Sequence, residues 1–172
     1  MKWLVLIAFA GVAHADPSPS ADMAAGIGLG YASPGSLVSV LELRVAVGGA
    51  WPDFRLAGLG GIHGERGPTS SKVTTGLGID ASLRVAPDWW LHALVEKPFS
   101  ADISVRVAAG PRWEPGDGWL GLDVEANTPG CVACTAYGVN VVLNVGGHGD
   151  TYRQLVIGIL LDIVLVSASY AL

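Results

Sequence analysis

The sequence predicts an all-β protein, an antiparallel up-and-down β-barrel that is transmembrane. Three observations predict this fold: an export signal at the N-terminus, two-residue alternation along several segments, and frequent short turn motifs. The clearest segment is 71–86, where about fourteen residues from Lys72 to Val85 alternate between polar and apolar. Successive side chains of a strand point to opposite faces, so this segment has one apolar and one polar face. Its length exceeds most soluble strands but suits a tilted strand across a bilayer, which needs about 9–11 residues.

The first 15 residues have the features of a secretory signal peptide. A positively charged start is followed by an apolar run over residues 3–12 and by the small-x-small pattern Ala13-His14-Ala15. The apolar run is too short for a membrane-spanning helix. We therefore expect a signal peptide over residues 1–15 and a mature chain, 16–172, that forms a single β-barrel domain.

The composition fits a barrel with a surface that does not face water. Charged residues make up 15% of the chain, whereas about 25% is usual in soluble domains. Glycine contributes 24 of 172 residues, which favours strands and tight turns over helices. The formal net charge of −5 is spread along the chain, so we expect no nucleic-acid partner.

Nine extended segments lie between turn motifs that are rich in glycine, proline, serine and aspartate. In order they cover residues 22–32, 37–47, 53–63, 71–86, 89–97, 101–113, 118–126, 135–145 and 152–170. The turns between them are short, as an up-and-down meander requires. Bacterial single-chain barrels have an even number of strands, from eight upward. We therefore expect eight strands, with ten as the alternative, and 22–32 and 89–97 carry the weakest signals.

Alternation alone does not say which face of the barrel points inward. The apolar face is uniformly aliphatic, as contact with lipid favours, and the polar face has charges of both signs that can pair across a narrow lumen. These charged residues are Glu42, Arg44, Lys72, Asp80, Arg84, Arg106, Asp123 and Glu125. We expect lipid contact for Leu77, Ile79, Leu83, Val105 and Val107, with Asp80, Arg84 and Arg106 in the lumen. A soluble barrel with the two faces exchanged is the alternative.

The tryptophans of the mature chain give a second indication of a membrane barrel. All five lie at predicted strand ends beside turns, where membrane barrels have aromatic belts. They are Trp51, Trp89, Trp90, Trp113 and Trp119.

With its signal peptide, alternating strands, short turns and Tyr170-Ala171-Leu172 end, the mature chain resembles the small outer-membrane β-barrels of Gram-negative bacteria, the eight-stranded OmpA/OmpX-like class. The resemblance is architectural and covers the whole mature chain. It implies a location in the cell outer membrane, contact with outer-membrane lipid and insertion by the barrel-assembly machinery. Members of the class typically end in an aromatic residue, whereas this chain ends in Leu172 with Tyr170 on the same parity. The segment 155–166 is apolar on both parities and is expected to form a strand, with an inserted helix as the alternative.

Cys131-Val132-Ala133-Cys134 is the only recognisable motif of thiol chemistry. Because an exported protein meets an oxidising compartment, we expect a disulfide between Cys131 and Cys134. We expect no catalytic residue, no cofactor and no metal site. The glycine patterns lack the strand–turn–helix setting of a nucleotide site, and the histidines lack metal-ligand spacing.

Some small outer-membrane barrels are lipid-modifying enzymes with a His/Ser or Asp/Ser constellation near one rim. His63 with Glu65, and Ser70 or Ser71 across the loop, is the nearest approach to such a constellation here. Histidines in such isolated settings are more often structural.

We therefore expect a non-enzymatic outer-membrane barrel with a role in envelope structure or surface interaction. An eight-stranded barrel has an interior just wide enough for side chains to fill, so an open pore is not expected. A soluble periplasmic or secreted barrel that binds a small apolar ligand is one alternative, and a lipid-modifying outer-membrane enzyme is the other. The oligomeric state does not follow from the residues.

Overall fold

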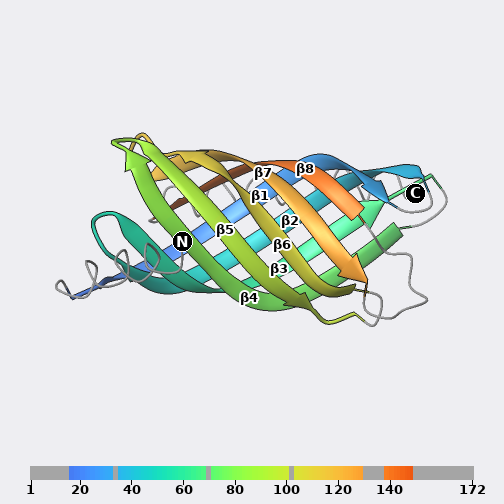
Figure 1. Ribbon diagram of the computed structural model, residues 1–172, viewed down its shortest axis with the longest axis horizontal. Coiled ribbons are helices and arrows are strands. Elements are labelled where there is room, and N and C mark those ends of the chain that lie inside the picture. The colour runs from blue at the N-terminus through green and yellow to red at the C-terminus, as the bar shows by residue number, and fades with distance from the viewer. Residues whose placement is uncertain (1–15, 33–34, 69–70, 101–102, 130–137, 149–172) are drawn as a thin grey trace, which may run out of the picture.

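The protein is a closed barrel of eight antiparallel strands, described by a computed structural model over residues 16–32, 35–68, 71–100, 103–129 and 138–148. Each strand pairs with its neighbours in sequence, and the pairing of β1 with β8 closes the sheet (Figure 1). No helix among these residues is long and apolar enough to cross a membrane. The strands are β1 (Ser18–Ala32), β2 (Ser36–Ala50), β3 (Phe54–Arg66), β4 (Ser71–Ala86), β5 (Trp89–Pro98), β6 (Ile103–Trp113), β7 (Gly118–Pro129) and β8 (Gly138–His148).

The predicted fold class and the preferred strand number are confirmed. The segment with the clearest alternation forms β4 over the predicted residues, and the two weakest segments form β1 and β5. The barrel closes without the segment 152–170, which lies outside the described residues together with the predicted signal peptide. The Tyr170-Ala171-Leu172 end also lies outside them.

Two strands extend through glycines at which the sequence predicts turns. β2 continues through Gly48 and Gly49, and β8 continues through Gly146 and Gly147, at positions where the sequence predicts turns. In β8 a glycine is needed because the interior is crowded, since a side chain at Gly146 would collide with the ring of Trp119. A glycine inside a strand can mark the close approach of another group, and here it makes room for the indole.

The register of the strands sets the width of the barrel. Following the paired residues once around the sheet from Asp22 leads back to Ala32, ten residues further along β1. A stagger of this size in an eight-stranded barrel tilts the strands by roughly 40° from the axis. The tilt is visible in Figure 1. The interior of such a barrel is filled by side chains.

The two ends of the barrel differ in the chain segments that they contain. The end where β1 begins and β8 ends, here called the terminal rim, has the turns 51–53, 87–88 and 114–117. The opposite end, the distal rim, has the connections 33–35, 67–70, 99–102 and 130–137. The turns at the terminal rim have two to four residues, and the connections at the distal rim have three to eight.

Polar side chains fill the barrel and apolar side chains cover its outside. Among the described residues, 16 polar or charged side chains are buried, compared with 11 apolar ones, which is the reverse of a soluble core. The predicted faces are confirmed where the strands are regular. Leu77 and Ile79 point outward with 60% and 59% exposure, whereas Asp80 and Arg106 are buried in the lumen.

Two residues depart from the predicted faces. Ile103 has the parity of Val105 and Val107, which were expected to point outward. Its side chain is buried, because the β6–β7 register shifts between Ile103 and Val105 and reverses the alternation. Arg84 keeps the lumenal parity of β4, yet it is exposed at the terminal rim. Its guanidinium donates hydrogen bonds to the Pro87 carbonyl at 2.6 and 3.1 Å.

The aromatic-belt interpretation was wrong for two tryptophans. Trp89 and Trp113 point outward at the terminal rim, but Trp90 and Trp119 point into the lumen and are about 95% buried. The inward rings have polar partners. Trp119 Nε1 donates to both carboxylate oxygens of Asp22 at 3.0 and 3.1 Å, so its burial leaves no unsatisfied donor.

Candidate functional site

The outward face of the described strands is an apolar band without charges between the rims. The only charged side chains on this face are Arg66, the last residue of β3, and Lys97, near the end of β5, and both lie at the distal rim. Lys97 Nζ donates to the Ser104 carbonyl oxygen at 2.9 Å. The band therefore presents only apolar and small polar side chains over the central part of the barrel.

The lumen holds an ionic network, which begins at the terminal rim with a bidentate pair. Arg55 Nη1 and Nη2 donate to the two Glu114 carboxylate oxygens at 2.7 and 2.8 Å. His148 Nε2 lies 2.8 Å from Glu114 Oε1. The Arg55 guanidinium also lies over the Trp90 ring, 3.9 Å from its centroid. These contacts connect β3, β5 and β8 through the 114–117 turn.

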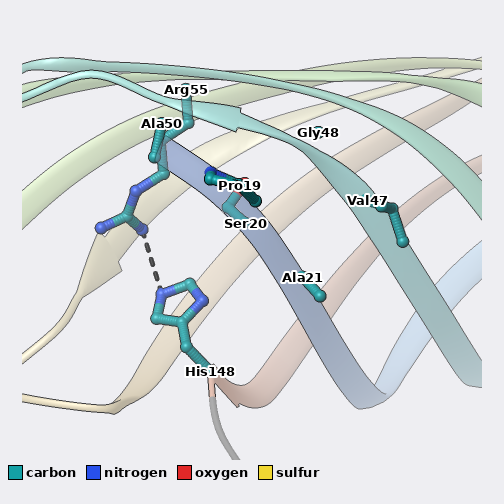
Figure 2. Close-up of a pocket in the computed structure, with 8 residues that line it drawn as sticks. All are labelled: Pro19, Ser20, Ala21, Val47, Gly48, Ala50, Arg55 and His148. Atoms are coloured by element: carbon teal, nitrogen blue, oxygen red, sulfur yellow. Dashed lines mark hydrogen bonds between the residues drawn. The ribbon is translucent and has the colours of Figure 1, made fainter. Parts of the chain in front are cut away.

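A cavity of about 520 Å³ opens at the terminal rim beside these residues. Figure 2 shows Arg55 and His148 on one side of it, in contact at 3.2 Å, with residues of β1 and β2 on the other. Its lining residues are Pro19, Ser20, Ala21, Val47, Gly48, Ala50, Arg55 and His148. The two charged residues both contact Glu114, and the other lining residues are small or apolar. The cavity thus offers no converging set of free polar groups.

Glu114 lies in the turn after β6, and its pKa is lowered from the ordinary value of 4.5. Burial alone would raise this pKa, but the hydrogen bonds from His148 and Arg55 outweigh it. A carboxyl group with a lowered pKa in the folded state stabilises the protein above its ordinary pKa. That contribution is lost as the pH falls through the folded-state pKa.

We predict that Glu114→Gln lowers the free energy of unfolding at pH 7 by about 1–3 kcal/mol, because charge-assisted hydrogen bonds are lost. The difference between the two proteins should shrink as the pH falls from 4.5 through the lowered folded-state pKa, below which the wild-type carboxyl is protonated in both states. Urea titrations of both proteins in detergent across this range measure the difference. A difference that does not change with pH would contradict the assignment.

The next part of the network is built around His92, whose two ring nitrogens both have partners. Arg112 Nη2 donates to His92 Nδ1 at 2.8 Å and to Asp80 Oδ2 at 2.7 Å. His92 Nε2 hydrogen-bonds to Asp123. Because Nδ1 accepts from Arg112, the ring proton belongs on Nε2, where it is donated to the carboxylate.

Arg44 lies at the centre of the network and contacts three carboxylates. Its Nη1 donates to Asp123 Oδ2 at 2.9 Å, and its Nη2 contacts Glu42 and Glu125. All four side chains are more than 90% buried. The guanidinium therefore connects β2 to β7 across the lumen.

Arg106 extends the network towards the distal rim. Its three guanidinium nitrogens donate to Asn127 Oδ1 at 3.1 Å, to Glu96 Oε1 at 3.2 Å and to Thr74 Oγ1 at 3.2 Å. Arg106 is 1% exposed. With Arg44 and Arg112, it distributes buried positive charge along the lumen, where ionic side chains are stable only with partners.

The structure brings together one part of the predicted enzyme-like constellation. His63 and Glu65 are paired, with Nε2 and Oε1 3.1 Å apart, on the lumenal face of β3. Ser71 begins β4 on the outward face and pairs with Arg66, so it lies on the other side of the sheet from His63. Ser70 and the predicted disulfide Cys131–Cys134 lie outside the described residues.

The sequence analysis missed a cluster of three buried residues, Glu42, His63 and Glu125, whose ligand atoms all lie within 4.8 Å of one another. They belong to β2, β3 and β7. Glu42 and His63 are direct partners in the β2–β3 register, a relation that spacing along the chain does not reveal.

No protein-family model and no curated protein matches the chain. Several solved structures are similar to it, among them two bacterial proteins. Ail, the attachment invasion locus protein of Yersinia pestis, has a TM-score of 0.54 at 11% sequence identity. Neisserial surface protein A has a TM-score of 0.55 at 13% identity. Each comparison covers 78% of this chain and 100% of the other. At these identities the likeness concerns the fold, and the chain has the fold of the small outer-membrane β-barrels.

Proposed function

We propose that the chain is a non-enzymatic barrel of the outer membrane that contributes to envelope structure or surface interaction. The observation that carries this proposal is the distribution of charged side chains. The outer face of the described strands has no charged side chain between the rims, whereas the lumen contains a network of paired ionic side chains. In water, an apolar surface of this extent would cause aggregation. In lipid, it is the surface that membrane barrels require.

The lengths of the turns at the two rims favour one orientation of the barrel in the membrane. Membrane barrels of bacteria have short turns on the periplasmic side, which is also where a single-chain barrel with an even number of strands has both ends. The terminal rim, with turns of two to four residues, is therefore assigned to the periplasm. Outer-membrane lipid and the barrel-assembly machinery are the partners that this proposal requires.

Two features bear on the choice between envelope structure and surface interaction. The two similar structures are an attachment protein and a surface protein by their names, which supports a role at the cell surface. The connections at the distal rim are short, which limits the area available for a partner. Any surface interaction would therefore use the distal rim rather than long loops.

Membrane fractionation tests the proposal against its alternatives. We expect the protein to stay in the outer-membrane fraction after carbonate and high-salt washes, because its apolar band holds it in lipid. Release by either wash would favour a soluble ligand-binding barrel. Lipid modification by the purified protein, and its absence in His63→Ala, would contradict the non-enzymatic assignment.

We also predict that the purified barrel gives no steady conductance in planar lipid bilayers, because paired side chains cross the lumen from rim to rim. A porin of known conductance recorded in the same membranes serves as the positive control. Large and reproducible channels would contradict the closed lumen and favour transport.

A further inference from the structure

The lumenal cluster of Glu42, His63 and Glu125 has two polar atoms that the rest of the network does not use. Glu42 Oε1 and His63 Nδ1 are buried and lack a hydrogen-bond partner. The three side chains are at most 3% exposed. Buried polar atoms are nearly always satisfied, so two unsatisfied atoms that face each other call for a ligand between them.

The hydrogen bond to Glu65 determines that His63 carries a proton on Nε2. His63 Nε2 donates to Glu65 Oε1 across 3.1 Å, which leaves Nδ1 with a lone pair directed at the cluster. Metal-binding histidines are usually held in this way, with the second ring nitrogen donating to a carboxylate or carbonyl. The neutral ring of His63 therefore has the orientation of a metal ligand.

The distances inside the cluster are close to those between the ligand atoms of a bound cation. His63 Nδ1 lies 4.0 Å from Glu42 Oε1 and 3.8 Å from Glu125 Oε2, too far for hydrogen bonds. Zinc bonds to imidazole nitrogen and carboxylate oxygen are about 2.0–2.2 Å long, and two of them at a tetrahedral angle place their ligand atoms roughly 3.4 Å apart. The two gaps would therefore close by roughly 0.4–0.6 Å around a bound cation. Arg44 contacts the other oxygen of each carboxylate and so orients the pair. Asn140 Nδ2 donates to Glu125 Oε2 at 3.3 Å.

The balance of charged side chains in the lumen also favours a bound cation. Among the buried side chains of the described residues, carboxylates outnumber guanidinium groups by six to three. Glu42, Asp123 and Glu125 share the single guanidinium of Arg44. Buried charges are stable when they are paired or coordinate a metal, and a divalent cation would offset most of this surplus.

We propose that Glu42, His63 and Glu125 bind a divalent transition-metal cation inside the barrel, with Zn²⁺ as the cation that one imidazole and two carboxylates suit. Glu65 is a positioning residue. Since side chains fill the lumen on both sides of the cluster, the cation would be taken up as the barrel folds and would act structurally. This inference does not depend on the proposed function.

The test is to refold the mature chain in detergent with Co²⁺, Zn²⁺ or a chelator, and to measure bound metal after dialysis. Co²⁺ also reports its ligands through its visible spectrum. We expect one metal per chain in the wild type. We expect at least tenfold weaker binding in His63→Gln and Glu42→Gln, and about 10–100-fold weaker binding in Glu65→Gln, which removes the charge of the group that accepts the proton of His63 Nε2.

His92→Gln is the matched control. His92 is buried in the same lumen and also touches carboxylates, but both of its nitrogens are engaged, so its loss should leave metal binding unchanged. Migration on unheated gels shows which variants fold. If His63→Gln does not fold, the comparison of Glu65→Gln with His92→Gln decides the question.

Three results would overturn the proposal. The first is no bound metal in the refolded wild type, and the second is equal loss in His63→Gln and His92→Gln. The third is evidence that Glu42 and Glu125 share a proton and that no metal lies between them. In that case an infrared carbonyl band of a neutral carboxylic acid would persist in excess Zn²⁺ and vanish in Glu42→Gln.

Discussion

Arg44→Met should lower the free energy of unfolding by about 3–5 kcal/mol, the cost expected when one partner of a buried ionic group is removed. Methionine keeps most of the volume of the side chain but leaves Glu42, Asp123 and Glu125 without their shared cation. Urea unfolding in phospholipid vesicles, followed by tryptophan fluorescence and carried out with a chelator, measures the loss.

Arg84→Met is the matched control for this experiment. Arg84 is also an arginine on the lumenal parity, but it is exposed at the rim, and its change should cost about 1 kcal/mol or less. Equal stability of Arg44→Met and wild type would mean that the carboxyl groups around Arg44 are already neutral.

Ile79→Arg should lower the free energy of unfolding in lipid by about 2–4 kcal/mol, the cost of an arginine on the lipid face near the bilayer midplane. Ile79 lies midway along β4, is 59% exposed and points outward. The effect should appear in vesicles as reduced stability or as reduced insertion.

Val73→Arg provides the comparison at a different depth. Val73 lies on the same face of the same strand, close to the distal rim, and is 71% exposed. At this position an arginine should lower the free energy of unfolding by only about 0–1 kcal/mol, because its side chain reaches the membrane–water interface. Equal effects at both positions would contradict the placement of this face in lipid.

The sequence predicted the barrel and its faces well because a strand has a period of two residues, and the alternation in β4 is nearly unbroken. It failed at Ile103 because a register shift in β6 changes the parity without any marker in the composition. The error over the tryptophans was avoidable. Trp89 and Trp90 are adjacent in one strand, so both could not belong to an outward belt.

The interior was less predictable than the faces. Glu42 and Glu125 were expected on the polar face, but their approach to His63 depends on the β2–β3 register and on the distance across the lumen. A search for metal ligands by spacing along the chain cannot find residues that meet across a barrel. The signal peptide and the Cys131–Cys134 disulfide stay predictions.

The connection of Arg44 to β7 also determines when the barrel can become stable during synthesis. Arg44 is translated long before its partners Asp123 and Glu125, and the edge of β1 has no partner until Gly138–His148 has been made. A nascent chain that ends before β7 therefore has an open sheet edge and an Arg44 side chain that lacks two of its three carboxylate partners. An open sheet edge can pair with other chains. The sheet can therefore close only when the whole barrel sequence, through the end of β8, is available.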